Sequence, residues 1–368
     1  MKTYFISSKR TLKDNFTPEK GKEKDNLIIL LMGKNILIFF CVLMITGLLS
    51  AQERGIPVYK DYLTDNLHLL HPSMAGTASR NEVRLTGRQM WFNVDDAPGL
   101  QTASINGRLN RNVGLGAILY NDSNGRFSQQ GSYFTFAYHI MYSRSTAFLN
   151  QLSFGINVGI IQEKLDETDI DLINNPDPII TGTEQHDNFF NLDVGISYNY
   201  LDFFAHFTAK NIIPQDRQIF TEVFETDNQR QFIASSGYTF SVPGNDRLAV
   251  QPSVLFQYKD ATGESNIDLN AKAYYELSNG KIWGGLSYRR SFNGAEFTAS
   301  GSNQVESQKL QTLSPFLGYD FGNLLFAYTY TNQINSVVLA NSGFHQITLG
   351  FRFGESRARP KCNCPAAN

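Results

Sequence analysis

Cysteine is scarce in this chain of 368 residues. It has three cysteines, and two of them, Cys362 and Cys364, lie close to the C-terminus. Disulfide bonds between distant parts of the chain therefore do not hold its fold together. The pair is also too isolated for a zinc site, because a structural zinc ion needs about four ligands. We interpret the two residues as a pair of thiols, or a local disulfide, in the C-terminal tail.

The sequence also lacks an apolar run long enough to cross a membrane as a helix. The longest run, residues 36–49, has about 14 residues, whereas a helical crossing needs about 20. It lies just after Met32 and ends close to Ala51, an arrangement typical of a secretory signal peptide. We therefore expect a signal peptide at residues 32–51, with a single anchor helix as the alternative. Residues 1–31 are then interpreted as a non-native upstream extension.

Neither sign of charge dominates the chain. It has 32 Lys and Arg residues against 34 Asp and Glu residues, a net charge of −2. Without residues 1–51, 24 basic and 30 acidic residues would remain, a net charge of −6. An acidic balance of this kind argues against a nucleic acid as the partner.

Motifs of enzymes and cofactor sites are missing as well. The sequence has no Gly-x-Ser-x-Gly motif, no Walker loop and no dinucleotide-binding fingerprint. None of the six histidines has a partner at a metal-ligand spacing, although His68 and His71 are three residues apart. The carboxylates between residues 166 and 171 fit no calcium-loop motif. We therefore predict a protein that is not an enzyme and that has no catalytic residue, cofactor or metal.

What the sequence does contain is alternation with a period of two. In residues 267–276 the odd positions are apolar or small apart from a tyrosine, and the even positions are mostly polar or charged, which predicts a β-strand with two unlike faces. The pattern returns along the chain and predicts fourteen strands: 82–89, 101–108, 113–121, 131–142, 151–164, 189–198, 203–211, 230–242, 248–258, 265–277, 281–289, 312–320, 324–330 and 343–353.

The connections between these strands alternate in length. Joins after even-numbered strands are short, such as 109–112 and 278–280, and joins after odd-numbered strands are mostly long, such as 165–188 and 290–311. Outer-membrane barrels have short periplasmic turns and long external loops. The sequence therefore predicts a single 14-stranded antiparallel transmembrane β-barrel, all-β in class, with both termini in the periplasm.

The two faces of the predicted strands differ in chemistry. In residues 203–210 phenylalanine and alanine would face lipid, and His206, Thr208 and Lys210 would face the lumen. Charged residues of both signs are expected inside: Arg84, Arg88, Arg108, Lys210, Asp268, Lys272, Glu276 and Arg352. We interpret them as a paired and filled interior rather than a selectivity filter, because small barrels fill their lumen with side chains.

Two flanking segments complete the predicted organisation. Residues 52–81 show no strand period but contain several leucines, which predicts an N-terminal periplasmic or plug segment. The barrel is expected to occupy residues 82–353, and residues 354–368 are expected to form a periplasmic tail.

With these motifs placed, the mature chain resembles the PorP/SprF family of type IX secretion system outer-membrane proteins of Bacteroidetes. The segment from His71 and Pro72 to Ala75 and Gly76 matches the family's Asn-Pro-Ala-Tyr-Ala-Gly motif, with His71 in place of the asparagine. A second match is the Arg-Gln-Met-Trp segment at 88–91, which includes Gln89, and it is followed by an Ala-Pro pair at 97–98. The resemblance marks His71, Pro72, Ala75, Gly76 and Gln89 as structural residues of the family.

The resemblance implies a function and a set of partners. Members of the family support the export or surface attachment of a specific large secreted protein, often an adhesin with a C-terminal export domain, as in gliding motility. Expected partners are that secreted protein, other type IX secretion components and outer-membrane lipid. The alternative function is an outer-membrane transporter or pore for small molecules, including hydrophobic ones.

The first predicted external loop supplies a candidate partner-binding site. Trp91 is an aromatic side chain close to Pro98, and a large apolar group on a stiff loop binds with little loss of entropy. We therefore predict that Arg88, Trp91 and Pro98 shape a pocket for the secreted partner. The alternative is that Trp91 belongs to the aromatic girdle and only anchors the barrel in lipid.

Overall fold

The computed structural model describes residues 60–90, 96–143, 148–168, 180, 182–214, 219, 230–298, 305–334 and 343–355. The chain divides into two units, Met1–Leu48 and Leu49–Asn368, and every described residue belongs to the second unit. The predicted signal peptide, the upstream extension and most of the predicted tail lie outside the described residues. Trp91 also lies outside them.

Three short 3-10 helices open the described part of the chain: η1 (Lys60–Thr64), η2 (Leu67–Leu69) and η3 (Pro72–Met74). None of the helices in this part is long and apolar enough to cross a membrane. The strands that follow are β1 (Arg80–Met90), β2 (Gly99–Arg108), β3 (Val113–Asn124), β4 (Phe127–Met141), β5 (Asn150–Asp166), β6 (Glu184–Tyr200), β7 (Phe203–Lys210), β8 (Gln231–Tyr238), β9 (Phe240–Val242), β10 (Asn245–Lys259), β11 (Ser265–Leu277), β12 (Gly280–Thr298), β13 (Val305–Phe321), β14 (Leu324–Gln333) and β15 (Phe344–Glu355).

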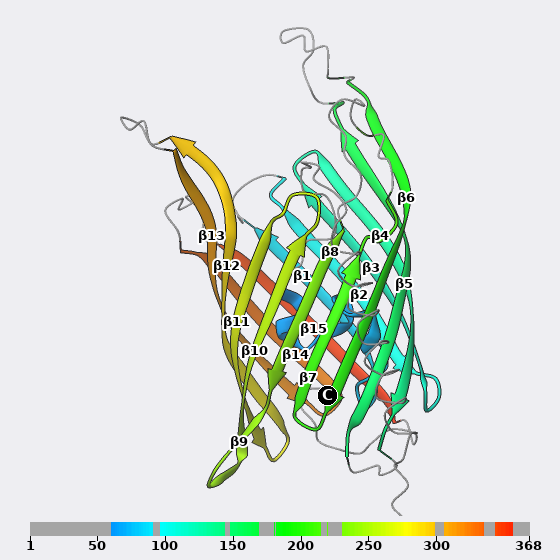
Figure 1. Cartoon of the computed structure of the whole chain (residues 1–368), viewed down its shortest axis with the longest axis vertical. Coiled ribbons are helices and arrows are strands. Elements are labelled where there is room, and N and C mark those ends of the chain that lie inside the picture. Colours follow the sequence, from blue (N-terminus) through cyan, green and yellow to red (C-terminus); the bar gives the residue numbers. More distant parts are fainter. Residues whose placement is uncertain are drawn as a thin grey trace, which may run out of the picture. The chain divides into compact units, whose positions relative to one another are not determined.

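These strands form one closed antiparallel barrel (Figure 1). Consecutive strands pair with each other, with the exception of β8 and β9, and β1 pairs with β15. Both β8 and β9 pair with β10, so they share one position in the barrel wall. The wall therefore has fourteen positions, which confirms the predicted fourteen-stranded fold.

The split between β8 and β9 corrects the prediction of one continuous strand at 230–242. Pro252 of β10 lies in the wall beside the break. The β8–β10 pairing ends at Ser253 with Gly237, and the β9–β10 pairing resumes at Val250 with Phe240. Because proline has no main-chain N–H, it cannot donate to the ladder, and the strand beside it is interrupted.

The predicted faces of the strands are confirmed. On β11 Leu269 is 52% exposed on the outer face, whereas the side chain of Asp268 is fully buried inside. On β7 Phe207 is exposed, and His206, Thr208 and Lys210 are buried. Apolar side chains face outward because the surrounding solvent of a membrane barrel is lipid.

Several strands run further than predicted toward the end of the barrel that carries the long loops. This end is called the long-loop end below, and the opposite end is called the short-turn end. Strand β6 begins at Glu184 instead of residue 189, and β12 continues to Thr298 instead of residue 289. The extensions escape detection because their side chains are mainly polar on both faces, so the alternation that marks a strand is lost.

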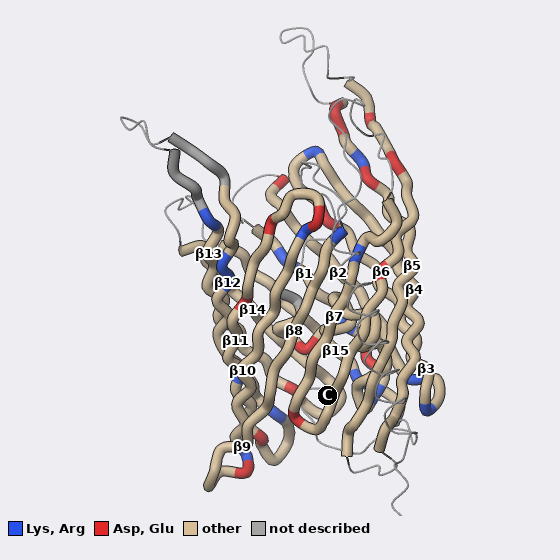
Figure 2. The backbone as a smooth tube through the Cα atoms, in the orientation of Figure 1, with Lys and Arg blue, Asp and Glu red and all other residues tan. Residues whose placement is uncertain are grey.

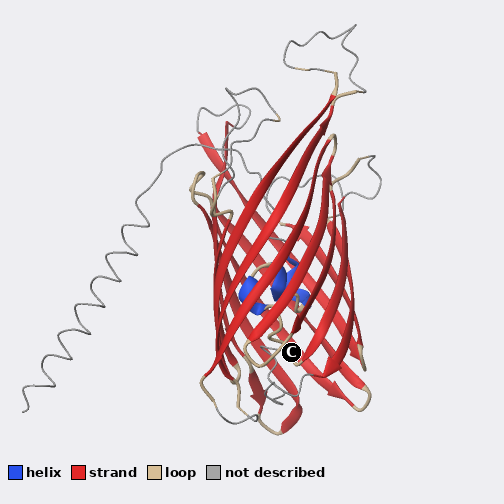
Figure 3. Cartoon of the chain, turned by 90° about the vertical axis from the view of Figure 1, so that its right-hand side faces the viewer, coloured by secondary structure: helices blue, strands red, loops and turns tan. Residues whose placement is uncertain are grey.

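Residues 60–79, called the inner segment here, lie inside the barrel. Figures 1 and 3 show the three short helices at about mid-height, enclosed by strands. The residues of the family motif within it, from His71 to Gly76, are all buried. The barrel wall therefore surrounds a stretch of chain that precedes it in the sequence.

Candidate functional site

The candidate site is the inner segment together with the inward-facing side chains that hold it. Its polar contacts reach strands β1, β2, β4, β6, β7, β8 and β11. These strands include adjacent and distant positions of the barrel wall, so the segment is fixed on several sides. A polar barrel interior suits this arrangement, because each buried main-chain group needs a hydrogen-bond partner.

His71 is the first residue of the motif and bonds two partners on neighbouring strands. Its Nδ1 lies 2.8 Å from Oγ1 of Thr208 on β7, and its Nε2 lies 3.0 Å from Oγ of Ser235 on β8. The ring also lies against His206, with the two ring centroids 5.0 Å apart. The side chain of His71 is fully buried, and each ring nitrogen has a hydroxyl group as its hydrogen-bond partner.

The motif ends in a turn that is fastened to β2 and β4. Gly76 has a left-handed backbone with φ of +71°, which favours glycine. Its N–H donates to Asn106 Oδ1 at 3.0 Å, and its carbonyl accepts from Arg108 Nε at 2.9 Å. One residue earlier, the carbonyl of Ala75 accepts a bond from His139 Nε2 at 3.1 Å. The turn therefore directs the chain from the lumen into β1.

Glycines on the inner wall make room for this motif. A Cβ atom added at Gly155 on β5 would lie 2.1 Å from the main-chain nitrogen of Ser73. A Cβ atom at Gly114 on β3 would lie 2.0 Å from the carbonyl oxygen of Ala75. Real Cβ atoms do not approach so closely, so the backbone of the inner segment rests directly on the wall at these points.

The first part of the inner segment is bound by charged groups of β11. The hydroxyl of Tyr62 donates to Oδ2 of Asp268 at 2.6 Å. The same carboxylate accepts two bonds from Arg289 of β12, at 2.6 and 2.7 Å. Asp268 is fully buried, so this forked pairing offsets the cost of taking its charge out of water.

Lys272 forms a second ionic contact with the inner segment. Its Nζ lies 2.5 Å from Oδ1 of Asp65 and 3.8 Å from the centre of the Trp283 ring. The ammonium group thus has an opposite charge on one side and the negative face of an aromatic ring on the other. Figure 2 shows that acidic and basic residues occur together along the strands rather than on separate sides.

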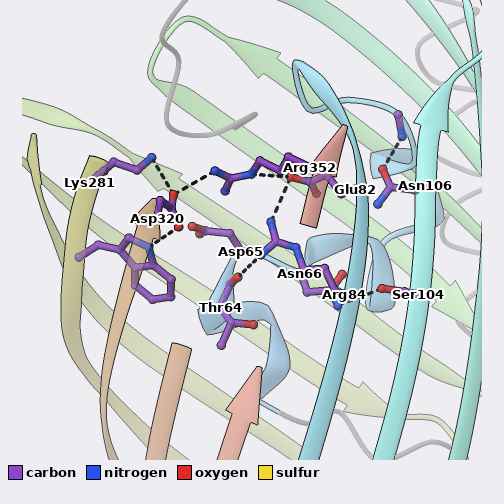
Figure 4. A network of polar contacts seen from close by, with 12 residues as sticks. Thr64, Asp65, Asn66, Glu82, Arg84, Ser104, Asn106, Lys281, Asp320 and Arg352 are labelled. Carbon is purple, nitrogen blue, oxygen red and sulfur yellow. Dashed lines mark hydrogen bonds and ion pairs between the residues drawn. The ribbon is translucent and has the colours of Figure 1, made fainter. Parts of the chain in front are cut away.

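A chain of ion pairs continues from this region toward the short-turn end (Figure 4). Arg84 donates to the main-chain carbonyl of Thr64 at 3.2 Å and to Glu82 at 3.0 Å. Arg352 then joins Glu82 at 3.2 Å to Asp320 at 3.1 Å. The expected pairing of interior charges is therefore present along this chain of contacts.

This network borders a cavity of about 500 Å³ at the short-turn end. Its lining includes Arg80, Glu82, Lys281, Asp320 and Arg352. Glu276 also lines this cavity, in keeping with its expected inward position, although its side chain is exposed there. It lies at the end of its strand, where the wall no longer covers it.

His68 shows how the inner segment keeps a neutral imidazole. Thr135 donates its hydroxyl proton to Asn157 Oδ1 at 2.6 Å, so its oxygen accepts from His68 Nε2, which lies 2.8 Å away. Burial lowers the pKa of His68 to about 4. Burial also lowers the pKa of His71 well below its ordinary value, with nearby His206 and Lys210 acting in the same direction. Both histidines belong to the inner segment rather than to a membrane-spanning strand.

The loop residues predicted to bind a partner lie at the long-loop end. The guanidinium carbon of Arg88 is 4.4 Å from the centre of the Phe344 ring. The carbonyl of Pro98 accepts a bond from the N–H of Met90 at 2.9 Å, which continues the β1–β2 ladder beyond Arg88. The structure therefore places Arg88 on β1 and Pro98 directly before the first residue of the neighbouring strand β2, and Trp91 lies outside the described residues.

The residues marked by the family motif fall into two groups. His71, Pro72, Ala75 and Gly76 are all buried in the inner segment. Gln89 is exposed on the outer face of β1, so it has no part in holding that segment. The predictions for these residues therefore concern two different surfaces.

Sequence reasoning missed the partners of the inner segment. His139, Asp268 and the glycines of β3 and β5 are not near the motif in the chain. One usable signal existed, since Gly114 and Gly155 occupy inward-facing positions of strands, where a small residue indicates the close approach of another backbone. Among the described residues no group of three or more His, Cys, Asp or Glu side chains is arranged to hold a metal ion.

Comparison with solved structures found chains that are similar at a low level. The CymD monoaromatic hydrocarbon channel is 11% identical with a TM-score of 0.45, over 83% of this chain and 95% of that one. A FadL homologue of Pseudomonas aeruginosa is 10% identical with a TM-score of 0.44, over 78% and 94%. BamA from Haemophilus ducreyi is 9% identical with a TM-score of 0.41, over 75% and 70%.

Comparison of sequences identifies the family. A search of curated proteins found no significant match. The model of the family described as type IX secretion system membrane protein PorP/SprF matches residues 51–351, which include the inner segment and nearly the whole barrel. The protein is thus an outer-membrane β-barrel, and the chain belongs to the PorP/SprF family of type IX secretion system membrane proteins.

Proposed function

We propose that this protein is a partner-specific accessory of type IX secretion, which supports the export or surface attachment of one large secreted protein. The observation that carries the proposal is the family match over residues 51–351. The partner is expected to be an adhesin-like protein with a C-terminal export domain, as in gliding motility. Other type IX components are expected to contact the periplasmic side, where we place both termini.

The filled interior of the barrel supports a function in binding a partner protein rather than the passage of solutes. The inner segment is bonded to wall strands on several sides. Charged groups in and beside it form ion pairs, Asp268 with Arg289 and Lys272 with Asp65, instead of lining a path for solutes. A pore or a transporter for small hydrophobic molecules, the alternative function, needs a continuous route through this region. A barrel whose inner segment is hydrogen-bonded to the wall is instead a rigid support for external loops.

The working surface of the accessory is proposed to include the pocket formed by Arg88, Trp91 and Pro98. Arg88 on β1 and Pro98 directly before β2 lie at the long-loop end, which is where an external partner would approach. A stiff loop and an aromatic side chain favour binding to a protein surface. The competing role for Trp91 is that of a lipid anchor in the aromatic girdle.

Deletion of the gene tests the proposed function. The surface proteins of the deletion strain are compared with those of the parent by surface labelling and mass spectrometry. We expect the loss of one large surface protein, with its transcript unchanged. A deletion strain that keeps all of its surface proteins would contradict the proposal.

Trp91→Ala tests the pocket separately. The amount of the barrel and its heat-dependent shift on gels are measured beside display of the surface protein. Loss of display with a normal barrel supports a pocket. Normal display, or loss of both together, leaves Trp91 as a lipid anchor.

Measurements in planar bilayers distinguish the alternative function. The purified protein is expected to show no steady conductance, because the inner segment is bonded to the wall inside the barrel. A stable conductance, or uptake of small hydrophobic molecules that depends on the protein, would favour the pore or transporter. No enzymatic activity is proposed, since the family is one of secretion proteins.

A further inference from the structure

Strand β6 stands further out of the barrel than the strand that follows it. It pairs with β5 along its whole length, from Glu184 to Tyr200. Its pairing with β7 covers only the part from Val194 to Tyr200. Figure 1 shows this extended part of β6 at the right-hand side of the long-loop end. At about 3.3 Å per residue, seven residues from Glu184 to Phe190 span about 20 Å of strand edge.

A buried polar cluster ends β7 at this point. Asn211 has a left-handed backbone with φ of +56°, which turns the chain out of the strand. Its N–H donates to Oδ1 of Asp193 at 3.0 Å, and its Oδ1 accepts from Nδ2 of Asn191 at 2.7 Å. The carbonyl of Leu192 still accepts a bond from Ile212 at 2.9 Å. Side chains of β6 therefore determine the residue at which β7 ends and the chain turns out of the sheet.

The hydrogen bonds show which main-chain groups face the open side. The N–H of Asp166 on β5 bonds to Arg126, on the β4 side, so Asp166 and the opposite residue Glu184 do not exchange bonds with each other. Because antiparallel pairs alternate, His186, Asn188 and Phe190 also direct their N–H and C=O groups away from β5. Leu192 occupies an equivalent alternate position on β6, and its carbonyl accepts a bond on the β7 side, in agreement with this assignment.

This edge has no partner strand within the described part of the chain. Antiparallel pairing of β6 with β7 begins only at Val194. Unpaired N–H and C=O groups in a row form a template for another strand, and proteins normally shorten or cover such edges. Here the edge is long, and the side chains of His186, Asn188 and Phe190 beside it are exposed.

The side chains around the edge carry an excess of negative charge. Among residues 163–168 and 184–190 the carboxylates that are not buried are Asp166, Glu184 and Asp187, against one lysine, Lys164. Lys164 is paired with Glu184, and His186 Nε2 lies 2.6 Å from the same carboxylate. At the lower end of the edge Phe190 is 61% exposed and offers an apolar surface.

We propose that the open edge of β6 from Glu184 to Phe190 binds an extended, basic segment of the secreted partner, which adds to the barrel wall as one more strand. Main-chain hydrogen bonds to His186, Asn188 and Phe190 give the affinity, and alternate side chains give the specificity. A lysine or arginine beside Glu184 or Asp187 and an apolar residue beside Phe190 fit the chemistry of the edge. The identity of this partner rests on the proposed function.

Asn188→Pro tests the edge, with Asn188→Ala as the matched control. Proline removes an N–H that faces the open side, so the β5–β6 ladder keeps all its bonds. Alanine removes the side chain and keeps the N–H. The measured quantity is display of the surface protein that the deletion strain loses, beside the amount and heat-dependent gel shift of the barrel. We expect display to fall about tenfold in Asn188→Pro, as for a lost strand bond in a binding site, and to stay normal in Asn188→Ala.

Photocrosslinking identifies what occupies the edge. p-Benzoylphenylalanine is placed at Phe190 and, as a control, at Ile156 on the lipid-facing side of β5, which is 44% exposed. The proposal expects position 190 alone to crosslink to the displayed surface protein. A crosslink to a second copy of this chain, a crosslink within the chain or no crosslink would overturn it.

The two proposals fail in different ways. A deletion strain that keeps every surface protein overturns the proposed function and, with it, the partner assigned to the edge. A deletion strain that loses a surface protein, combined with normal display in Asn188→Pro, overturns the edge alone.

Discussion

His71 and Thr208 are 137 positions apart in the chain, yet Nδ1 of His71 lies 2.8 Å from Oγ1 of Thr208 inside the barrel. The contact joins the family motif to β7, while the other ring nitrogen reaches Ser235 on β8. A single side chain thus fastens the inner segment to two neighbouring strands. The predictions below test this fastening and the barrel that surrounds it.

Replacement of His71 is expected to loosen the inner segment. His71→Ala removes a partner from the buried hydroxyls of Thr208 and Ser235, of which Ser235 keeps its contact with His206, and the expected cost is about 1–3 kcal/mol. His71→Asn keeps a polar group at the position and should cost less. Urea titration of the refolded barrel measures the stability, and hydrogen exchange of residues 67–77 reports the segment itself. Equal stability of the two variants would show that these bonds contribute nothing.

A larger residue at Gly155 is expected to displace the inner segment and leave the barrel closed. The added Cβ of Gly155→Val would lie 2.1 Å from the main-chain nitrogen of Ser73. Gly87→Val is the control, because no atom lies within 4 Å of a Cβ built at Gly87. We expect faster hydrogen exchange of the inner segment and measurable conductance in Gly155→Val only. Normal exchange in that variant would contradict the close contact.

Replacing one partner of the buried pair of Asp268 and Arg289 should lower the stability of the barrel more than replacing both partners with apolar residues. Asp268→Ala leaves the arginine without its carboxylate and Tyr62 without its acceptor, at a cost of about 3–5 kcal/mol. The double variant Asp268→Leu with Arg289→Met removes both charges and should recover part of the loss. The midpoints of urea unfolding of the unchanged protein, Asp268→Ala and the double variant measure these differences in stability. A double variant less stable than Asp268→Ala would mean that the pair itself stabilises the fold.

Acid is expected to loosen the inner segment. The folded protein holds the pKa of His68 at about 4, below the ordinary value of 6.5, because the side chain is buried. Stability from the neutral ring is therefore complete above pH 6.5 and is lost as the pH falls from 6.5 toward 4. Hydrogen exchange of residues 67–77 at pH 7.5 and 5, corrected for the intrinsic rates, measures the effect. His68→Gln should reduce the pH dependence, and an unchanged dependence would assign it to other groups.

A charge on the lipid-facing side of β11 should destabilise the barrel. Leu269→Arg places a guanidinium in the hydrocarbon region, at a cost of about 2 kcal/mol or more near its centre. Glu276→Arg is the control, because Glu276 is exposed at the short-turn end. Folding titrations in lipid vesicles compare the two. Similar costs would show that the assigned membrane position of β11 is wrong.

The sequence by itself determined the strands, their faces and the sorting of loops by length. These features are local, because a period of two along 267–276 or 203–210 appears in neighbouring residues and needs no knowledge of distant ones. It also determined the family, through motif segments such as His71 to Gly76 that keep their order along the chain.

The tertiary structure alone decided where the inner segment lies and which strands stand free. His71 finds Thr208 and Ser235, and Asn211 is turned out of its strand by Asp193, only once the barrel has closed. No local pattern encodes such contacts, since each depends on the register of strands that are far apart in the sequence. The open edge of β6 has the same origin: its residues show that a strand begins, but the length of β7 decides that no strand of the described part of the chain pairs with it.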